Sequence, residues 1–178
     1  MTARACVTGR FQPVHEDHLR LFRMGLEEQD RLIVGVTNPD PSSRRPEPAS
    51  GHRHREDANP FTYWERCELL LAALDHDARV VIVPFDLGRP ELWEGYAPLD
   101  AVQYVGRGGP WETEKARRLA AAGYRVVEVE PAPGERRTST GIRAAMRAGE
   151  AWEPLVPPAT VAPLRAMLAR RRARGVPL

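Results

Sequence analysis

The sequence holds a single lysine, Lys115, among its 26 basic residues, and arginine supplies all the others. Because no Gly-Lys-Ser or Gly-Lys-Thr step is present, the chain cannot contain a P-loop, the commonest ATP-binding motif. Cysteine is also scarce, since Cys6 and Cys67 stand alone in apolar surroundings without a metal-type spacing between them. We expect two buried thiols in a reducing compartment rather than disulfides or a zinc finger.

Long apolar runs are missing too. No segment approaches the roughly 20 apolar residues of a membrane span and no signal peptide opens the chain, so we expect a cytoplasmic protein without a membrane partner. The net charge of +2 gives no reason to expect nucleic-acid binding. A length of 178 residues suits one domain, with an α/β core over residues 1–150 and a helical extension over residues 151–178.

Short apolar runs alternate with segments of helical periodicity. The runs that predict strands cover residues 3–8, 31–37, 79–85, 100–106 and 124–130. Helices are predicted after residue 15, after a capping box at Thr62 and Glu65, over residues 111–122 up to Gly123, after Thr138, and over residues 159–174. Strands and helices that alternate in this way favour an α/β fold with a parallel sheet.

The most informative stretch, residues 9–18, reads Gly-Arg-Phe-Gln-Pro-Val-His-Glu-Asp-His and joins the first strand to the first helix. His15 and His18 are three positions apart, so they share one face of the helix start. Free backbone N–H groups and the positive end of the helix dipole at the same place favour an anionic ligand. The pair alone leaves two other interpretations open: incidental surface imidazoles, or a zinc pair whose third ligand is not evident.

Two later segments contain polar side chains that could contact a nucleotide. Residues 42–59 are rich in Pro, Arg and His without apolar periodicity, and they predict a mobile surface loop that is either solvated charge or a lid over a nucleotide. Residues 138–143, Thr-Ser-Thr-Gly-Ile-Arg, place hydroxyl groups and Arg143 at a helix start. Such side chains can cap the helix or cradle phosphate groups.

Residues 9–18 resemble the phosphate-binding His-x-x-His signature of the nucleotidyltransferase superfamily, and they look most like the archaeal-type nicotinamide mononucleotide (NMN) adenylyltransferases. Residues 59–66, Asn-Pro-Phe-Thr-x-x-Glu-Arg, are similar to a second segment of that family, as are residues 138–143 and 151–157. The resemblance implies a Rossmann-like nucleotidyltransferase fold, with a five-stranded parallel sheet flanked by helices and a C-terminal helical extension.

The resemblance also implies roles for individual residues. It implies catalytic roles for His15, His18 and Arg143. It implies nucleotide binding by Gly9, Arg10, Phe11, Gln12, Pro13, Thr138, Ser139 and Thr140, and acceptor binding by Asp86 and Trp93. Judged by its sequence position alone, Trp93 suits the core equally well. Mg²⁺ is implied as the cofactor, without a metal held by the protein, and a homo-oligomer is the expected assembly.

The implied reaction moves a nucleoside monophosphate from a nucleoside triphosphate to a small phosphate-bearing molecule and releases pyrophosphate. ATP and NMN, which together give NAD, are the first expectation for the substrates. The family has glycine where Asp17 stands and asparagine about where Pro90 stands. These departures keep open cytidylyl or adenylyl transfer to another small phosphate or phosphonate, and a nucleotide sensor without turnover is the third possibility.

Overall fold

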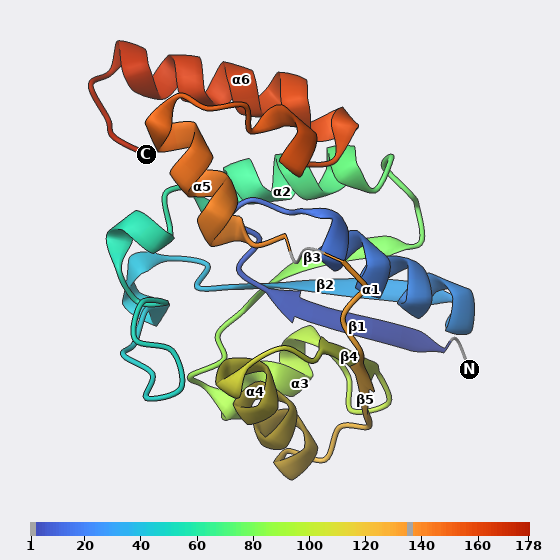
Figure 1. The fold of residues 1–178 in the computed structure, drawn as a ribbon. Coiled ribbons are helices and arrows are strands. Elements are labelled where there is room, and N and C mark those ends of the chain that lie inside the picture. The colour runs from blue at the N-terminus through green and yellow to red at the C-terminus, as the bar shows by residue number, and fades with distance from the viewer. Residues whose placement is uncertain (1–2, 135–136) are drawn as a thin grey trace.

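Five parallel strands form the centre of the fold, in the order β3-β2-β1-β4-β5 (Figure 1). They are β1 (Arg4–Gly9), β2 (Arg31–Thr37), β3 (Val80–Phe85), β4 (Val102–Gly106) and β5 (Val126–Val129). The computed structural model describes residues 3–134 and 137–178, and the predicted parallel sheet is confirmed. β5 is shorter than predicted because the backbone N–H of Tyr124 bonds to the carbonyl of Leu119 at the end of the preceding helix.

Helices cover both faces of the sheet (Figure 1). One face carries α1 (Glu16–Glu28), α2 (Tyr63–Ala73), α5 (Ser139–Ala148) and α6 (Pro158–Ala173), and the other carries α3 (Trp93–Tyr96) and α4 (Pro110–Ala121). Side chains of β1 alternate between the two apolar cores, because successive residues of a strand point to opposite faces. Val7 belongs to the core under α1, and Cys6 belongs to the core under α4.

The direction of the chain across the sheet reverses beside β1. The first three strands step outward from β1 to β3, and the chain then crosses back to place β4 and β5 on the other side of β1. In open parallel sheets, ligands bind outside the carboxyl ends of the strands at such a reversal. Gly9 and Gly106, the last residues of β1 and β4, mark this point.

The predicted C-terminal helix is confirmed as α6, which packs on the main core. Leu164 and Met167 on α6 are buried in the main core, and Val161 and Leu168 are half-buried against it. α6 lies along α2 (Figure 1). Cys6 is buried as expected, whereas Cys67 on α2 is only half-buried. Within residues 3–134 and 137–178, no helix has both the length and the apolar character needed to cross a membrane.

Candidate active site

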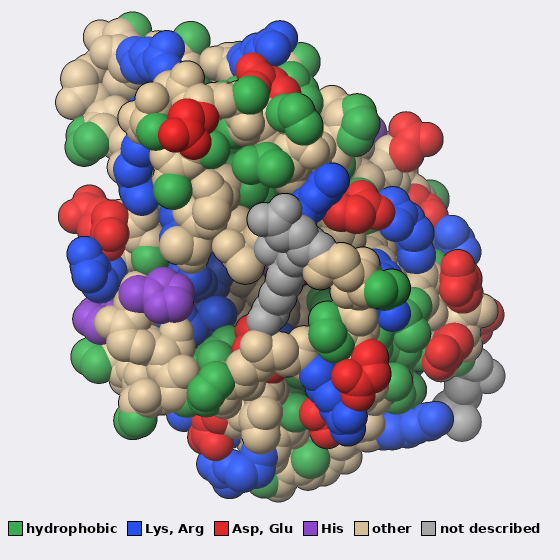
Figure 2. Space-filling view, in the orientation of Figure 1, with side chains coloured by type: hydrophobic (Ala, Val, Ile, Leu, Met, Phe, Trp, Pro, Cys, Tyr) green, Lys and Arg blue, Asp and Glu red, His purple; other side chains and the backbone are tan. Residues whose placement is uncertain are grey.

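A cavity of about 380 Å³ opens at the carboxyl edge of the sheet, where the strand order reverses. Its walls come from separate parts of the chain, within residues 8–21, 49–53, 106–115, 129–132 and 137–140. Figure 2 shows Lys and Arg side chains inside a hollow of the molecule, beside His side chains. Most of the predicted nucleotide site lines this cavity: Gly9, Arg10, Phe11, His15, His18, Thr138, Ser139 and Thr140.

The two histidines lie against each other at the N-terminus of α1. His15 is the N-cap residue, and its ring centroid lies 3.8 Å from that of His18. The backbone N–H of His15 donates to Nδ1 of His18 over 3.2 Å. A neutral imidazole that accepts a hydrogen bond at Nδ1 carries its proton at Nε2. This arrangement leaves Nε2–H of His18 available to donate to an anionic oxygen in the cavity.

The charge state of His18 is set by its surroundings. Burial lowers the pKa of His18 well below its ordinary value of 6.5, and the positive charges of Lys115, Arg53 and Arg10 lower it further together with His15. The imidazole is therefore neutral at physiological pH. A neutral donor can bind a phosphate oxygen without first binding a proton from solvent.

Gly9 and Phe11 shape the histidine pair. Phe11 adopts a left-handed backbone with φ of 51°, and its buried ring meets the edge of the His18 ring at a centroid distance of 4.9 Å. A Cβ atom at Gly9 would stand 2.8 Å from two ring atoms of Phe11, which is closer than carbon atoms can approach. The glycine is thus needed for the ring to sit behind His18.

Gln12, Pro13 and Arg143 are not part of the cavity wall. Gln12 is 1% exposed, and its side-chain amide exchanges two hydrogen bonds of 2.9 Å with the backbone of Phe61. The Gln12 side chain therefore braces the loop against the start of α2 instead of lining the cavity. The carbonyl of Pro13 accepts a hydrogen bond from Oγ of Ser139 at 3.0 Å, which ties the same loop to α5.

The start of α5 combines capping with contacts to the histidine loop. Oγ1 of Thr138 accepts from the backbone N–H of Gly141 at 3.1 Å, so the capping role of this hydroxyl is confirmed. Arg143 is 2% exposed and donates to the carbonyl of Gln12 at 2.8 Å and to Oγ1 of Thr140 at 3.3 Å. Arg143 thus orients Thr140, which lines the cavity, from behind the wall.

The Asn-Pro-Phe-Thr-x-x-Glu-Arg segment supports the site from outside. Thr62 and Glu65 form the predicted capping box of α2. Arg66, 1% exposed, donates to the carbonyl of Arg10 at 3.0 Å and to the carbonyl of Thr37 at 2.7 Å. One guanidinium therefore holds the chain just past the carboxyl ends of β1 and β2 in place.

Buried positive charge surrounds the cavity. Within the described residues, no carboxylate lies at ion-pair distance from Arg10, Arg66, Lys115 or Arg143, and each of these side chains is at most 8% exposed. Nζ of Lys115 donates to the carbonyl of Thr8 at 2.9 Å. Burial lowers the pKa of both Arg10 and Lys115 to about 8, and neighbouring arginines add to the shift. A buried cation without a protein carboxylate favours a bound anion.

Of the Lys and Arg side chains that line the cavity, the sequence assigned Arg10 to the site and missed Arg20, Arg107, Lys115 and Arg137, whereas Arg53 belongs to the loop for which a lid was one expectation. Lys115 lines the cavity from α4, and Arg53 lines it from the long loop, with its guanidinium 4.3 Å from the centroid of the Trp111 ring. A signal was present for Lys115, because Trp111, Lys115 and Leu119 follow one another at spacings of four and all three are buried. The only lysine of the chain therefore stands on the apolar face of its helix.

The loop of residues 42–59 is tied to α4. Glu47 accepts two hydrogen bonds from the guanidinium of Arg118, at 3.0 and 2.7 Å, and Arg53 stacks on Trp111. His52 and Arg53 line the cavity. The expected mobile loop therefore has defined contacts with the rest of the chain, and the position of His52 and Arg53 agrees with a lid better than with solvated charge.

Asp86 and Trp93 lie outside the cavity. Trp93 is 1% exposed, stacks on Phe85 at a centroid distance of 5.6 Å, and donates from Nε1 to the carbonyl of Asp86 at 2.8 Å. Of the two alternatives for Trp93, the structure shows the core position, because the ring and its N–H are both used inside the fold. The carboxylate of Asp86 pairs with Arg45 at 3.3 Å.

The described residues offer no set of ligands for a metal ion bound by the protein alone. No three His, Cys, Asp or Glu side chains of residues 3–134 and 137–178 come together in a way that could hold a metal ion. The zinc alternative for His15 and His18 therefore lacks a third ligand there. Asp17 does line the cavity, which places one carboxylate near the histidine pair.

The family model of the cytidylyltransferase-like family matches residues 6–132, a range that contains β2 to β5, most of β1 and both histidines. The chain belongs to this family. Two curated relatives cover most of this cytidylyltransferase-like chain. A phosphonoformate cytidylyltransferase of Streptomyces viridochromogenes is 38% identical over 159 residues, which are 86% of this chain and 85% of the relative. A nicotinamide-nucleotide adenylyltransferase of Pyrococcus horikoshii is 30% identical over 181 residues, which are 97% of this chain and 88% of the relative.

Solved structures agree with this assignment of the fold. A bifunctional NMN adenylyltransferase/ADP ribose pyrophosphatase from Francisella tularensis superposes with a TM-score of 0.64 at 15% identity, over 88% of this chain and 45% of that chain. A putative nicotinate-nucleotide adenylyltransferase from Vibrio parahaemolyticus gives a TM-score of 0.57 at 16% identity, over 92% and 99%. The predicted resemblance and the Rossmann-like nucleotidyltransferase fold are confirmed, and the cytidylyltransferase-like protein is a nucleotidyltransferase.

Proposed function

We propose that this nucleotidyltransferase moves a cytidylyl group from CTP to a small phosphonate or phosphate and releases pyrophosphate. The relative at 38% identity is named for that reaction with phosphonoformate, whereas the NMN adenylyltransferase of Pyrococcus horikoshii is 30% identical. The observation that carries the proposal is the size and lining of the cavity. At about 380 Å³ it lies at the low end of the roughly 300–1,000 Å³ of small-molecule sites, so it suits one nucleotide with a small acceptor better than two nucleotides.

The aromatic side chains support a small acceptor as well. A nicotinamide ring binds well against an open aromatic face. Phe11 and Trp111 are the Phe and Trp residues among the described lining, and both are buried. The guanidinium groups of Arg53 and Arg118 lie over the Trp111 ring, and Trp93 is in the core. Cations rather than open rings meet the acceptor.

The proposed reaction needs positioning and charge compensation more than covalent help. An oxygen of the acceptor attacks the α-phosphorus of CTP, a new P–O bond forms, and the bond to the bridging oxygen of the β-phosphate breaks, so that pyrophosphate leaves with the electron pair. His18 donates from Nε2 to a phosphate oxygen, with His15 beside it, and Arg10 compensates negative charge from the cavity wall. The hydroxyls of α5 bind the outer phosphates.

Mg²⁺ is the proposed cofactor, and when bound it would neutralise part of the negative charge of the triphosphate. Since no metal-binding cluster occurs in the described ranges, the residues fit a cation that arrives with the nucleotide. Asp17 is a cavity carboxylate available to such a cation.

A second candidate is adenylyl transfer from ATP to NMN, which forms NAD. It is supported by the NMN adenylyltransferase relatives, one of which aligns with 97% of this chain. The two candidates share the histidines and the cations around the cavity, and they differ only in the base and the acceptor.

Pyrophosphate release by the purified protein with Mg²⁺ tests the proposal directly. CTP, ATP, GTP and UTP are each crossed with phosphonoformate, with other small phosphonates and with NMN. The proposal predicts turnover with CTP and a small phosphonate. Turnover confined to ATP with NMN would establish the second candidate instead, and silence with every pair would leave a nucleotide-binding protein without this activity.

A further inference from the structure

Lys115 places a buried ammonium group at the reversal point of the sheet. Its Nζ lies 2.9 Å from the carbonyl oxygen of Thr8, one residue before the end of β1, and the side chain is 8% exposed. An ammonium group has three donors, of which this carbonyl uses one. Within the described chain no carboxylate pairs with Lys115, and the side chain lines the cavity. Two donors are therefore available to a ligand.

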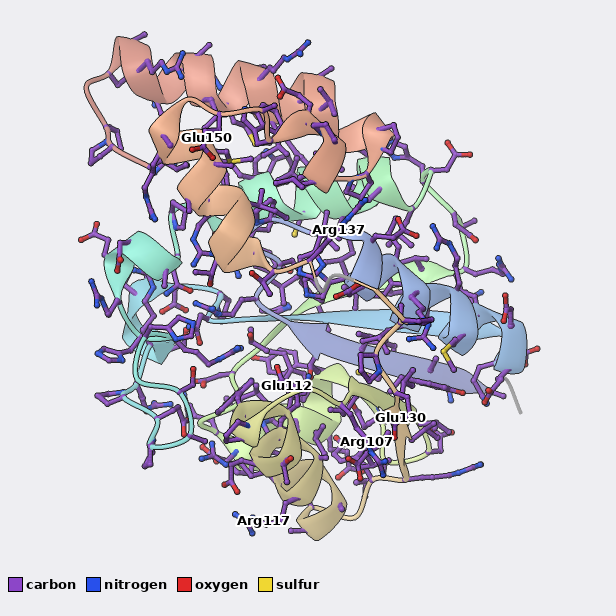
Figure 3. All side chains as sticks on the ribbon, in the orientation of Figure 1. Arg107, Glu112, Arg117, Glu130, Arg137 and Glu150 are labelled. Carbon is purple, nitrogen blue, oxygen red and sulfur yellow. The ribbon has the colours of Figure 1, made fainter. Side chains whose placement is uncertain are left out.

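Arg53 offers a second unpaired cation to the same part of the cavity. Its guanidinium is held 4.3 Å over the Trp111 ring, and no described carboxylate lies within ion-pair distance of it. Arg53 is close enough to Lys115 for its charge to lower the pKa of the lysine. Arg107, another cavity cation, differs because Glu128 and Glu130 neutralise it; Figure 3 shows Arg107 beside Glu130.

These two cations approach the cavity from the face of the sheet opposite to the helices that carry the histidines, and both are close enough to His18 for their charges to lower its pKa. His15 and His18 come from α1, and Thr138 comes from the start of α5, both on the face that carries α2 and α6. Lys115 comes from α4 on the other face, and Arg53 is held against α4 through Trp111. A cavity that serves two substrates can therefore bind the triphosphate from one face and the acceptor from the other.

We propose that Lys115 and Arg53 form an anion subsite for the acceptor, which binds the anionic group that does not attack, such as the carboxylate of a carboxyphosphonate. This inference rests on the proposed function and names the residues that select its acceptor. Glu112, which also lines the cavity, raises the pKa of both cations through its charge, but no ion pair joins it to either of them within the described residues. A second anionic group on the acceptor can therefore pair directly with Lys115 and Arg53, and an acceptor that lacks this group cannot.

The test compares two ligands on three proteins by isothermal titration calorimetry. The ligands are phosphonoformate and methylphosphonate, which lacks the carboxylate. The proteins are the wild type, Lys115→Met and the matched control Arg117→Met, which removes an exposed cation on the outer side of the same helix (Figure 3). Lys115→Met should weaken phosphonoformate binding about tenfold or more, from the loss of a charged hydrogen bond, with less than about a twofold effect on methylphosphonate. Arg117→Met should change neither.

The subsite is overturned if the wild type and Lys115→Met bind phosphonoformate with equal affinity. It is also overturned if Lys115→Met loses the same factor of affinity for phosphonoformate and methylphosphonate, or if the wild type does not bind phosphonoformate. If Lys115→Met does not fold, Lys115→Gln, which keeps a donor for Thr8, replaces it. Pyrophosphate release by the wild type separates the two levels of the proposal. Lysine-dependent binding without turnover rejects the proposed function and keeps the subsite, whereas turnover with lysine-independent binding rejects the subsite alone.

Discussion

The backbone N–H of His15 donates to Nδ1 of His18, so the cap of α1 fixes the proton of the second histidine on Nε2. The same contact orients the His18 ring against Phe11 and towards the cavity. One local hydrogen bond thus converts the end of a helix into a preorganised donor for a phosphate oxygen.

Replacement of His18 by alanine should reduce turnover far more than stability. Loss of one preorganised donor lowers kcat about 10²–10³-fold, whereas loss of a capping contact costs about 1 kcal/mol of unfolding free energy. Glu27→Ala, an exposed change on the same helix, is the matched control and should alter neither quantity. Near-normal turnover in folded His18→Ala would remove His18 from the mechanism.

His18 should not change its protonation state within the physiological pH range. Its pKa is held well below 6.5, mainly by burial, so the Hε1 resonance of His18 should not titrate between about pH 6.5 and 8. Because the unfolded chain binds a proton near pH 6.5 and the folded His18 does not, the free energy of unfolding should fall as the pH drops below about 6.5. An NMR inflection for His18 between pH 6.5 and 8 would contradict this account.

Gln12→Ala should destabilise the protein without a direct effect on ligand contacts. The change leaves the buried backbone N–H and carbonyl of Phe61 without their partners, which costs about 2–4 kcal/mol for the two groups. Urea denaturation measures the loss as a lower midpoint. An unchanged midpoint would show that the amide does not brace the loop.

The bond between Glu47 and Arg118 should keep the long loop closed against α4. Glu47→Gln breaks a half-buried bidentate pair, so trypsin should cleave within the arginine-rich residues 42–59 several times faster, with a stability loss of at most about 1 kcal/mol. Glu91→Gln breaks an exposed pair with Arg89 elsewhere and serves as the control. Equal cleavage of both variants and the wild type would show that this pair does not restrain the loop.

The fold could be predicted from the sequence because its local signals agree. The five apolar runs became the five strands, and the Thr62–Glu65 box begins α2 as expected. The strand predicted over residues 124–130 begins too early, because the backbone N–H of Tyr124 bonds to the last turn of α4 instead of joining the sheet. The parallel arrangement followed from the alternation of strands and helices, whereas the order β3-β2-β1-β4-β5 was not predicted and comes from the structure.

The site was only partly predictable, and the reason is geometric. The histidine pair and the start of α5 are continuous segments, so their spacing revealed them. Lys115 reaches Thr8 across 107 positions of the chain, and Arg53 reaches Trp111 across 58, so no local pattern joins either pair. The sequence position of Trp93 suited either a core residue or an acceptor-binding residue, and only its packing on Phe85 in the structure decides between the two.

The most direct test of the central claim follows the oxygen atoms through the reaction. Phosphonoformate labelled with ¹⁸O in its phosphonate group is incubated with CTP, Mg²⁺ and the protein, and the products are read by ³¹P NMR. The account predicts the label in the oxygen that bridges the acceptor phosphorus and the cytidylyl phosphorus, with unlabelled pyrophosphate. Conversion of CTP to CMP and pyrophosphate with the label left in free phosphonoformate would contradict it, because water rather than the acceptor would then be the nucleophile.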